Sequence, residues 1–216
     1  MKLNIPNFPV SEIENIIFDF GGVIMDINIG RTIAAFSSLR IEGLDSDDII
    51  SAHKKFLLDL ELGLITPSQF IDAIHTDYPA AKNVSEKQIW DAWNALLQPY
   101  LPERIALLES IKKNYRTYLL SNTNFPHRVK FKAMYREQFG ENFDDLFIKC
   151  FYSDEMQLRK PDHEIYRQVM ADIRLNPKNT LFIDDNELNI TEARNFGLQA
   201  YHLAGGERIT DLFIPD

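Results

Sequence analysis

The feature that most constrains the fold is the order of the apolar runs along the chain. Short runs rich in Ile, Leu, Phe and Tyr have the length and composition of strands that are buried on both faces of a sheet. Segments with apolar residues at helical spacing separate the later runs. This alternation predicts an α/β fold with a doubly wound, Rossmann-like parallel sheet. We expect its strands at 16–19, 118–121, 147–152, 180–184 and 200–203.

The stretch between the first two strands is too long for a simple crossover and reads as one helix after another. Thr66 with Gln69, and Ser85 with Gln88, have the spacing of capping boxes, so we expect helices to begin near 67 and 86. We therefore predict an inserted α-helical cap. The predicted division is a core domain of residues 1–27 and 104–216 and a cap of residues 28–103.

Two further features belong to this predicted cap. Gly63 is expected to end a helix, and Trp90 and Trp93 are interpreted as packing between cap helices rather than as stacking on a ligand. The helix before Gly63 is expected to carry Ile49, Ile50, Phe56, Leu57 and Leu60.

Composition and charge narrow the function classes. The chain has 216 residues, 45% of them hydrophobic, and a formal net charge of −9, so no basic surface is expected for nucleic acid or anionic lipid. No apolar stretch approaches the roughly 20 residues that span a bilayer, and no signal peptide is recognised. Cys150 is the single cysteine and is interpreted as a buried structural thiol. We expect a cytoplasmic protein without nucleic-acid or membrane partners; the oligomeric state is left open.

Polar residues follow the predicted strands at their carboxyl ends. Asp19 ends the first strand, Ser121 and Asn122 end the second, and Asp184 and Asp185 end the fourth. In open α/β sheets, ligands bind at this edge. Each residue also has a simpler interpretation as a helix cap or a turn former. Three neighbouring carboxylates would repel one another, however, and all-oxygen ligands suit Mg²⁺.

Lys160 follows the third strand and stands directly before Pro161, which we expect to start a helix. A positive charge at a helix N-terminus opposes the helix dipole. A bound anion would resolve that conflict.

Four motifs occur in order along the chain: IIFDFGGVIMD, YLLSNTN, RKPDHEIY and LFIDDNELNITEARNFG. Together they resemble the motifs of the haloacid dehalogenase-like (HAD) hydrolase superfamily. The helical insert, with ELGLITPSQF and WNALL, is similar to the cap of the subgroup that contains sugar phosphatases and dehalogenases.

The resemblance implies roles for these residues. Asp19 would be the nucleophile that forms an aspartyl-phosphate, and Ser121, the backbone N–H of Asn122 and Lys160 would hold the phosphoryl oxygens. It also implies that Mg²⁺ is held by Asp19, the carbonyl of Gly21 and Asp185, with Asp184 binding the ion directly or through a water.

Gly21 departs from the family pattern, because the family usually has a second acid there that protonates the leaving oxygen. Three functions stay open. The first is an Mg²⁺-dependent phosphatase acting on a small phosphorylated metabolite, and DFGGV resembles the first motif of α-glucose-1-phosphate phosphatases, which also have glycine there. The second is a 2-haloacid dehalogenase, and the third is a binding protein without turnover.

Other polar residues are given no firm function. Asp26, Asn28 and Arg31 lie at the cap entrance, where Arg31 is interpreted as a solvated charge, with contact to a sugar hydroxyl or a second anion as the alternative. The remaining histidines lack metal-ligand spacing and receive no role: His53, His75, His127 and His202.

Overall fold

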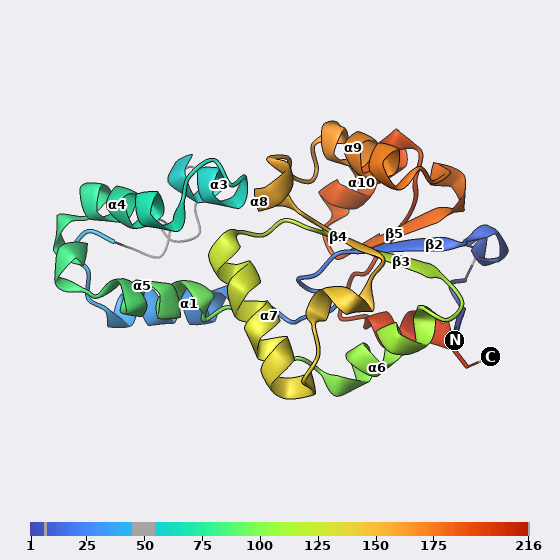
Figure 1. Cartoon of the computed structure of the whole chain (residues 1–216), viewed down its shortest axis with the longest axis horizontal. Helices are drawn as coiled ribbons and strands as arrows, with labels where there is room; N and C mark the ends of the chain where they lie inside the picture. Colours follow the sequence, from blue (N-terminus) through green and yellow to red (C-terminus); the bar gives the residue numbers. More distant parts are fainter. Residues whose placement is uncertain (7, 45–54, 216) are drawn as a thin grey trace.

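A five-stranded parallel sheet forms the centre of the core, in the order β4-β3-β2-β5-β6 (Figure 1). The computed structural model describes residues 1–6, 8–44 and 55–215. The predicted fold class is confirmed, and all five predicted strands are present with ends that differ by at most two residues. The strands are β2 (Asn15–Phe18), β3 (Arg116–Ser121), β4 (Lys149–Tyr152), β5 (Thr180–Asp184) and β6 (Gln199–His202).

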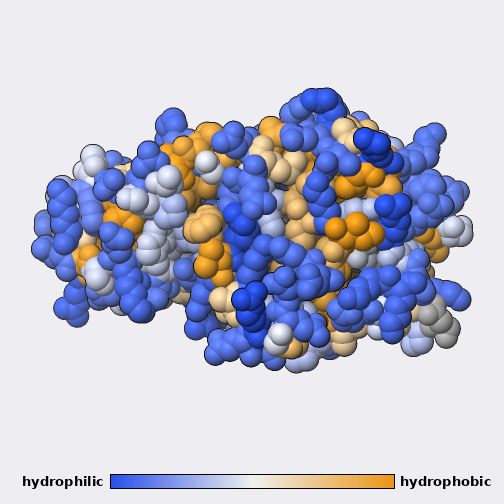
Figure 2. All heavy atoms as spheres, in the orientation of Figure 1, coloured by the Kyte–Doolittle hydropathy of each residue, from blue (hydrophilic) through white to orange (hydrophobic). Residues whose placement is uncertain are grey.

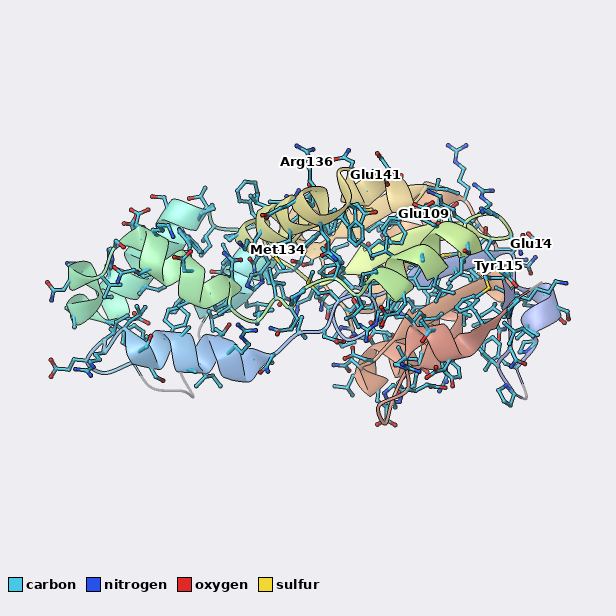
Figure 3. The ribbon with its side chains drawn as sticks, turned by 90° about the horizontal axis from the view of Figure 1, so that it is seen from below. Glu14, Glu109, Tyr115, Met134, Arg136 and Glu141 are labelled. Carbon is cyan, nitrogen blue, oxygen red and sulfur yellow. The ribbon has the colours of Figure 1, made fainter. Side chains whose placement is uncertain are left out.

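Helices cover both faces of this sheet, because successive side chains of a strand point to opposite faces. Ile16 and Phe18 pack with α6 (Pro102–Ile111) and α7 (Phe125–Phe139). Ile17 faces the other way, toward α9 (His163–Ile173) and α10 (Glu187–Phe196). In Figure 3, α6 and α7 lie over the same side of the core and carry the labelled Glu109 and Arg136. With both faces covered, the carboxyl edge of the sheet is left for a site.

Short elements complete the core. The strands β1 (Lys2–Leu3) and β7 (Phe213–Ile214) pair antiparallel, so the two ends of the chain lie together (Figure 1). The helix α8 (Ser153–Met156) follows β4 directly. The remaining core elements are single 3₁₀ turns: η1 (Val10–Glu12), η3 (Phe143–Leu146), η4 (Pro177–Asn179) and η5 (Ile209–Leu212).

The predicted insert forms a helical lobe with an apolar core of its own (Figures 1 and 3). Thr66 and Ser85 both form complete capping boxes, which confirms helix starts at 67 and 86. The ring of Phe70 stacks on Trp90 at 5.3 Å, as the packing interpretation of Trp90 requires. Ile49, Ile50 and His53 lie outside the described residues. The described cap elements are α1 (Ile29–Ser38), α3 (Lys55–Glu61), α4 (Pro67–Asp77), η2 (Pro79–Asn83) and α5 (Glu86–Asn94).

The two connections between cap and core run side by side. The backbone N–H of Asn28 donates to the carbonyl of Leu96 at 2.8 Å, and that of Gln98 donates to the carbonyl of Asp26 at 3.2 Å. The chain thus leaves the core and returns to it through one narrow junction. The division at 27/28 and 103/104 stays a prediction.

The surface is predominantly hydrophilic in the view of Figure 2, with apolar side chains in small separate patches. Within the part of the chain that the structure describes, no helix is both long and apolar enough to cross a bilayer. Cys150 is half-buried, and burial raises the pKa of its thiol to about 12, so it stays protonated at neutral pH.

Candidate active site

Three charged side chains meet at the carboxyl edge of the sheet. The ammonium of Lys160 lies 2.5 Å from Oδ1 of Asp19 and 2.6 Å from Oδ2 of Asp184. All three are buried, with relative exposures of 1%, 8% and 0%. Asp19 directly follows β2, and Asp184 is the last residue of β5. These two parallel strands are adjacent and in register, which places the two carboxylates side by side. The structure therefore brings together residues that are far apart in the sequence.

Neighbouring amides fix the orientation of Asp184 and Lys160. Oδ1 of Asp184 accepts from the backbone N–H of Asn186 at 2.8 Å, and the side-chain amide of Asn189 donates to both of its oxygens. The side chain of Asn122 forms two bonds with the backbone of Lys160: its Nδ2 donates to the carbonyl at 2.8 Å and its Oδ1 accepts from the N–H at 2.9 Å. Asn122 therefore positions the lysine with its side chain.

The expectation for the helix after Lys160 is wrong. Pro161 does not start a helix, because α9 begins at His163 with Asp162 as its N-cap. Two carboxylates already compensate the charge of Lys160, so the supposed conflict with a helix dipole does not arise. A bound anion is not needed to explain where this lysine stands.

The donor set fits an Mg²⁺ ion. Asp19, Asp184 and Asp185 each offer a carboxylate oxygen, and these oxygens lie within 4.8 Å of one another. No backbone N–H of the described residues donates to the carbonyl of Gly21, which is the fourth ligand that the sequence resemblance implies. At Gly22, φ is +74° and an added Cβ would lie 2.1 Å from Oδ2 of Asp185. Gly22 therefore permits both the turn and the approach of Asp185.

Burial shifts the protonation of the cluster. It raises the pKa of Asp19 to about 7; Lys160 acts against this rise and Asp184 adds to it. Burial alone would lower the pKa of Lys160, but the two carboxylates outweigh it and raise that pKa. The pKa of Asp185 is also raised, by burial and by Asp184. Three carboxylates against one ammonium leave a negative excess that a divalent cation would neutralise.

The remaining predicted phosphate ligand is Ser121, which is buried at the end of β3. Its hydroxyl lies 3.4 Å from the carbonyl of Asn122, a weak contact that leaves it free to turn toward a ligand. Asn124 caps α7 by accepting from the N–H of His127 at 3.1 Å.

Residues at the cap entrance are paired with protein groups. Nη1 of Arg31 donates to Gln98 at 2.9 Å in an exposed position. Asp26 forms an ion pair with the buried Arg104 at 2.7 Å. These contacts agree with the interpretation of Arg31 as a surface charge.

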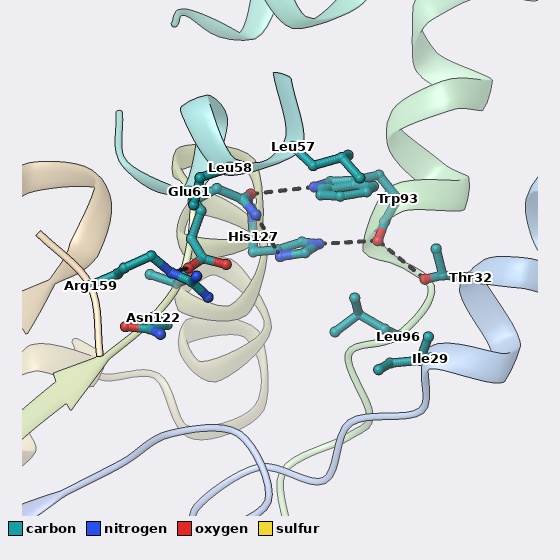
Figure 4. Close-up of a pocket in the computed structure, with 12 residues that line it drawn as sticks. Ile29, Thr32, Leu57, Leu58, Glu61, Trp93, Leu96, Asn122, His127 and Arg159 are labelled. Atoms are coloured by element: carbon teal, nitrogen blue, oxygen red, sulfur yellow. Dashed lines mark hydrogen bonds and ion pairs between the residues drawn. The ribbon is translucent and has the colours of Figure 1, made fainter. Parts of the chain in front are cut away.

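His127 has a structural role that was not predicted from the sequence. Its ring stacks on Trp93 at 5.1 Å, with 8° between the planes, and its Nε2 lies 3.1 Å from the carbonyl of Trp93. Trp93 belongs to the cap and His127 to the core, so this contact joins the two (Figure 4). The interpretation of Trp93 as packing only between cap helices was too narrow. No sequence signal distinguishes such a histidine from a surface one.

Sequence reasoning also missed an ion pair between Glu61 of α3 and Arg159, the residue before Lys160. Nε of Arg159 donates to Oε1 of Glu61 at 2.6 Å, and both line a cavity between cap and core (Figure 4). Gly63 lies nearby with φ +62°, and a Cβ there would stand 2.0 Å from the carbonyl of Asp154. The positions of Glu61 in the ELG segment and of Arg159 beside Lys160 were the available signals.

Comparisons with known proteins agree with this geometry. A model of the haloacid dehalogenase-like hydrolases matches residues 13–197. A curated relative, the D-ribitol-5-phosphate phosphatase of Bacteroides thetaiotaomicron, is 26% identical over 197 residues, covering 90% of this chain and 93% of the relative.

Solved structures agree as well. A HAD family enzyme from Bacteroides thetaiotaomicron superposes with a TM-score of 0.87 at 33% identity, covering 94% of this chain and 99% of that chain. An Asp-to-Ala variant of that enzyme was solved with magnesium and inorganic phosphate and superposes with a TM-score of 0.86. A HAD-like family hydrolase from Porphyromonas gingivalis is 31% identical, with a TM-score of 0.80 over 91% of this chain and 93% of that one. Because the family model covers most of the chain, the protein belongs to the haloacid dehalogenase-like hydrolases.

Proposed function

We propose that this protein is an Mg²⁺-dependent phosphatase that hydrolyses a small phosphorylated metabolite through an aspartyl-phosphate on Asp19. The observation that carries the proposal is the group of the buried Asp19 and Asp184 and the exposed Asp185, whose oxygens lie within 4.8 Å of one another beside a single ammonium. The related enzyme solved with magnesium and phosphate supports the same chemistry.

The chain's own residues supply the steps of this reaction. Asp19 attacks phosphorus as the ester P–O bond breaks, and the leaving oxygen takes a proton from solvent; water then attacks phosphorus, which releases phosphate and restores Asp19. Asn122 holds the backbone of Lys160 so that its ammonium faces the nucleophile. Lys160 has three N–H donors and uses two on Asp19 and Asp184, so one remains for a phosphoryl oxygen. Ser121 and the N–H of Asn122 are the proposed further donors to that group.

The metal site proposed for this step uses Asp19, Asp184, Asp185 and the carbonyl of Gly21. When bound, Mg²⁺ neutralises the acidic cluster and polarises the phosphoryl group. A glycine supplies the carbonyl ligand as well as any other residue, so the loss of a side chain at Gly21 leaves the metal ligand set intact.

The missing acid at Gly21 affects the leaving group instead. Without a carboxylic acid there, the reaction should favour esters whose oxygen leaves easily, and the anomeric oxygen of a sugar 1-phosphate is such a group. D-ribitol-5-phosphate, the substrate in the curated relative's name, has a primary alcohol as leaving group. These two candidate substrates, a sugar 1-phosphate and D-ribitol-5-phosphate, differ at the oxygen that leaves. Measured kcat/KM values for both therefore show which type of ester the enzyme prefers.

Two alternatives are weaker. For a 2-haloacid dehalogenase, the acidic excess around Asp184 and Asp185 would repel the carboxylate of the substrate. A binding protein without turnover would have no use for a nucleophile held 2.5 Å from a lysine ammonium.

The direct test is release of phosphate from p-nitrophenyl phosphate over many turnovers. We expect sustained release with Mg²⁺, none with EDTA, and recovery when Mg²⁺ is added back. A single burst of one equivalent, or release that is indifferent to EDTA, would overturn the proposal. Chloride release from 2-chloropropionate without metal would support the dehalogenase instead.

A further inference from the structure

A cavity of about 280 Å³ lies between cap and core, next to the candidate active site (Figure 4). It is small, since ligand pockets commonly measure roughly 300–1,000 Å³. Asn122, whose side chain holds Lys160, forms part of its wall, and Arg159 is the residue before that lysine. Much of the remaining wall is apolar: Ile29, Leu57, Leu58, Leu96 and the ring of Trp93.

Several polar groups of this wall are already satisfied by the protein. His127 spans from the carbonyl of Trp93 at 3.1 Å to the side-chain amide of Asn124 at 3.0 Å, which occupies both ring nitrogens. Both side-chain ends of Asn122 are bonded to the backbone of Lys160. These groups have little capacity left for a ligand.

The pair of Glu61 and Arg159 is different. Only Nε of Arg159 and Oε1 of Glu61 take part in their contact, at 2.6 Å. Among the described residues, neither the terminal nitrogens of Arg159 nor Oε2 of Glu61 has a hydrogen-bond partner at this wall. Both side chains are partly exposed, at 34% and 27%. This corner of the cavity therefore offers donors and an acceptor together, with no net charge.

We propose that Glu61 and Arg159 recognise the end of the substrate far from the phosphate, and that this end is uncharged and carries hydroxyl groups, as in a polyol or sugar monophosphate. The proposal rests on the phosphatase function proposed above. A hydroxyl both donates and accepts, so it can bond to the carboxylate and to the guanidinium at once. The carbon backbone of such a substrate would pack on the apolar wall.

The same corner disfavours other substrate classes. A second phosphate or a carboxylate would be attracted to Arg159 but would lie against the like charge of Glu61. An entirely apolar end would bury the open donors and the acceptor without partners. The neutral pair thus selects by the charge of the far end.

Two probes isolate this selection: ribitol 5-phosphate and 5-phosphoribonate. They share the reacting ester and differ only in a terminal hydroxymethyl against a terminal carboxylate. We expect the native protein to have a kcat/KM at least about tenfold higher for ribitol 5-phosphate, because the site hydrogen-bonds the hydroxyl and repels the anion.

The selectivity is the ratio of kcat/KM for ribitol 5-phosphate to kcat/KM for 5-phosphoribonate. Removing the negative charge and removing the positive charge should change this ratio in opposite directions. Glu61→Gln leaves Arg159 uncompensated and should lower the ratio about tenfold or more, whereas Arg159→Gln should raise it. Glu155→Gln is the matched control, because Glu155 pairs with Arg128 outside the cavity and its loss should leave the ratio unchanged. Circular dichroism and thermal midpoints establish that each variant is folded.

A native preference for 5-phosphoribonate, or equal ratios in native protein and both charge variants, would overturn the inference. Calorimetry with Mg²⁺ measures the dissociation constants of both probes without turnover. It is done on Asp19→Asn alone and on Asp19→Asn combined with each charge variant. Loss of selectivity there contradicts the role of the pair. Selective binding without any hydrolysis by the native enzyme contradicts the phosphatase function and leaves the recognition intact.

Discussion

Two buried polar networks in this molecule differ in their balance of charge. At the carboxyl edge of the sheet, Lys160 faces Asp19 and Asp184, with Asp185 close by. Between cap and core, the ring of His127 stacks on Trp93 and is bonded at both nitrogens. The first network holds an excess of negative charge, and the second is neutral and complete.

The difference separates groups that act on a ligand from groups that hold the fold. Buried charges are costly unless they are compensated, so an acidic excess is retained where a cation and a reacting group complete it. A neutral network with its hydrogen bonds made needs nothing further. Charge or hydrogen-bonding capacity that the protein itself leaves unmet, rather than burial, distinguishes the two networks.

The largest effect that tests this contrast is Asp19→Asn. An amide has nearly the same shape but cannot attack phosphorus, so turnover should fall at least about 10⁴-fold. Because Asp184 still pairs with Lys160, the protein should stay folded. Steady-state rates and circular dichroism check both points. Asp172→Asn, which removes an exposed partner of Lys149, is the control; full activity of Asp19→Asn would exclude the covalent route.

The neutral network around His127 should make the free energy of unfolding depend on pH. Burial lowers the pKa of His127 from 6.5 to about 4. The unfolded chain therefore binds a proton between these values that the native protein does not, so stability is fully present above about pH 6.5 and falls as the pH drops toward 4. The loss should reach at most about 3 kcal/mol.

The difference between native protein and His127→Gln isolates this contribution, since carboxylates titrate in both. Urea unfolding at pH 7 and pH 4.5 measures it. The free energy of unfolding of the native protein should drop more over this interval than that of the variant. Equal drops would mean that the histidine is not buried in its neutral form.

The charged network should respond to metal where the neutral one does not. At a free Mg²⁺ concentration of 100 times its dissociation constant, binding should stabilise the folded protein by about 2.7 kcal/mol. A rise in the thermal midpoint with Mg²⁺ is expected for the native protein and should be smaller for Asp185→Asn. The same rise in Asp185→Asn and in native protein would place the ion elsewhere.

The smallest effect concerns Gly21. An added Cβ there would meet Cδ1 of Ile27 at 3.2 Å, and Ile27 is 43% exposed, so it can move aside. Gly21→Asp should therefore be tolerated and should speed poor leaving groups most. We expect glucose 1-phosphate to be hydrolysed faster than glucose 6-phosphate by native protein, and the gap to narrow about tenfold in the variant.

The readout is kcat/KM for both esters in both proteins, with Mg²⁺ binding verified in each. Equal factors for the two esters, or a native preference for the 6-phosphate, would show that the leaving group does not explain Gly21.

The sheet, the cap helices and the acidic cluster could all be predicted from the sequence. Strand and helix signals are local: an apolar run, or a capping box such as that of Thr66, acts within a few residues. Asp19 and Asp184 could be predicted to meet because parallel strands end at one edge of the sheet. Element boundaries were less certain, as the helix start expected at Pro161 and found at His163 illustrates.

The contribution of the cap could not be predicted in this way, because it depends on contacts that form in the folded protein. The angle at which the cap meets the core depends on packing across segments far apart in the chain, and no local pattern encodes it. That packing placed His127 against Trp93 and Glu61 against Arg159. Within the core, the bonds from the side chain of Asn122 to the backbone of Lys160 also join segments that are far apart in the sequence. Chemistry carried by consecutive motifs can be predicted from sequence, whereas selection by a cavity between two lobes depends on contacts that exist only after both have folded.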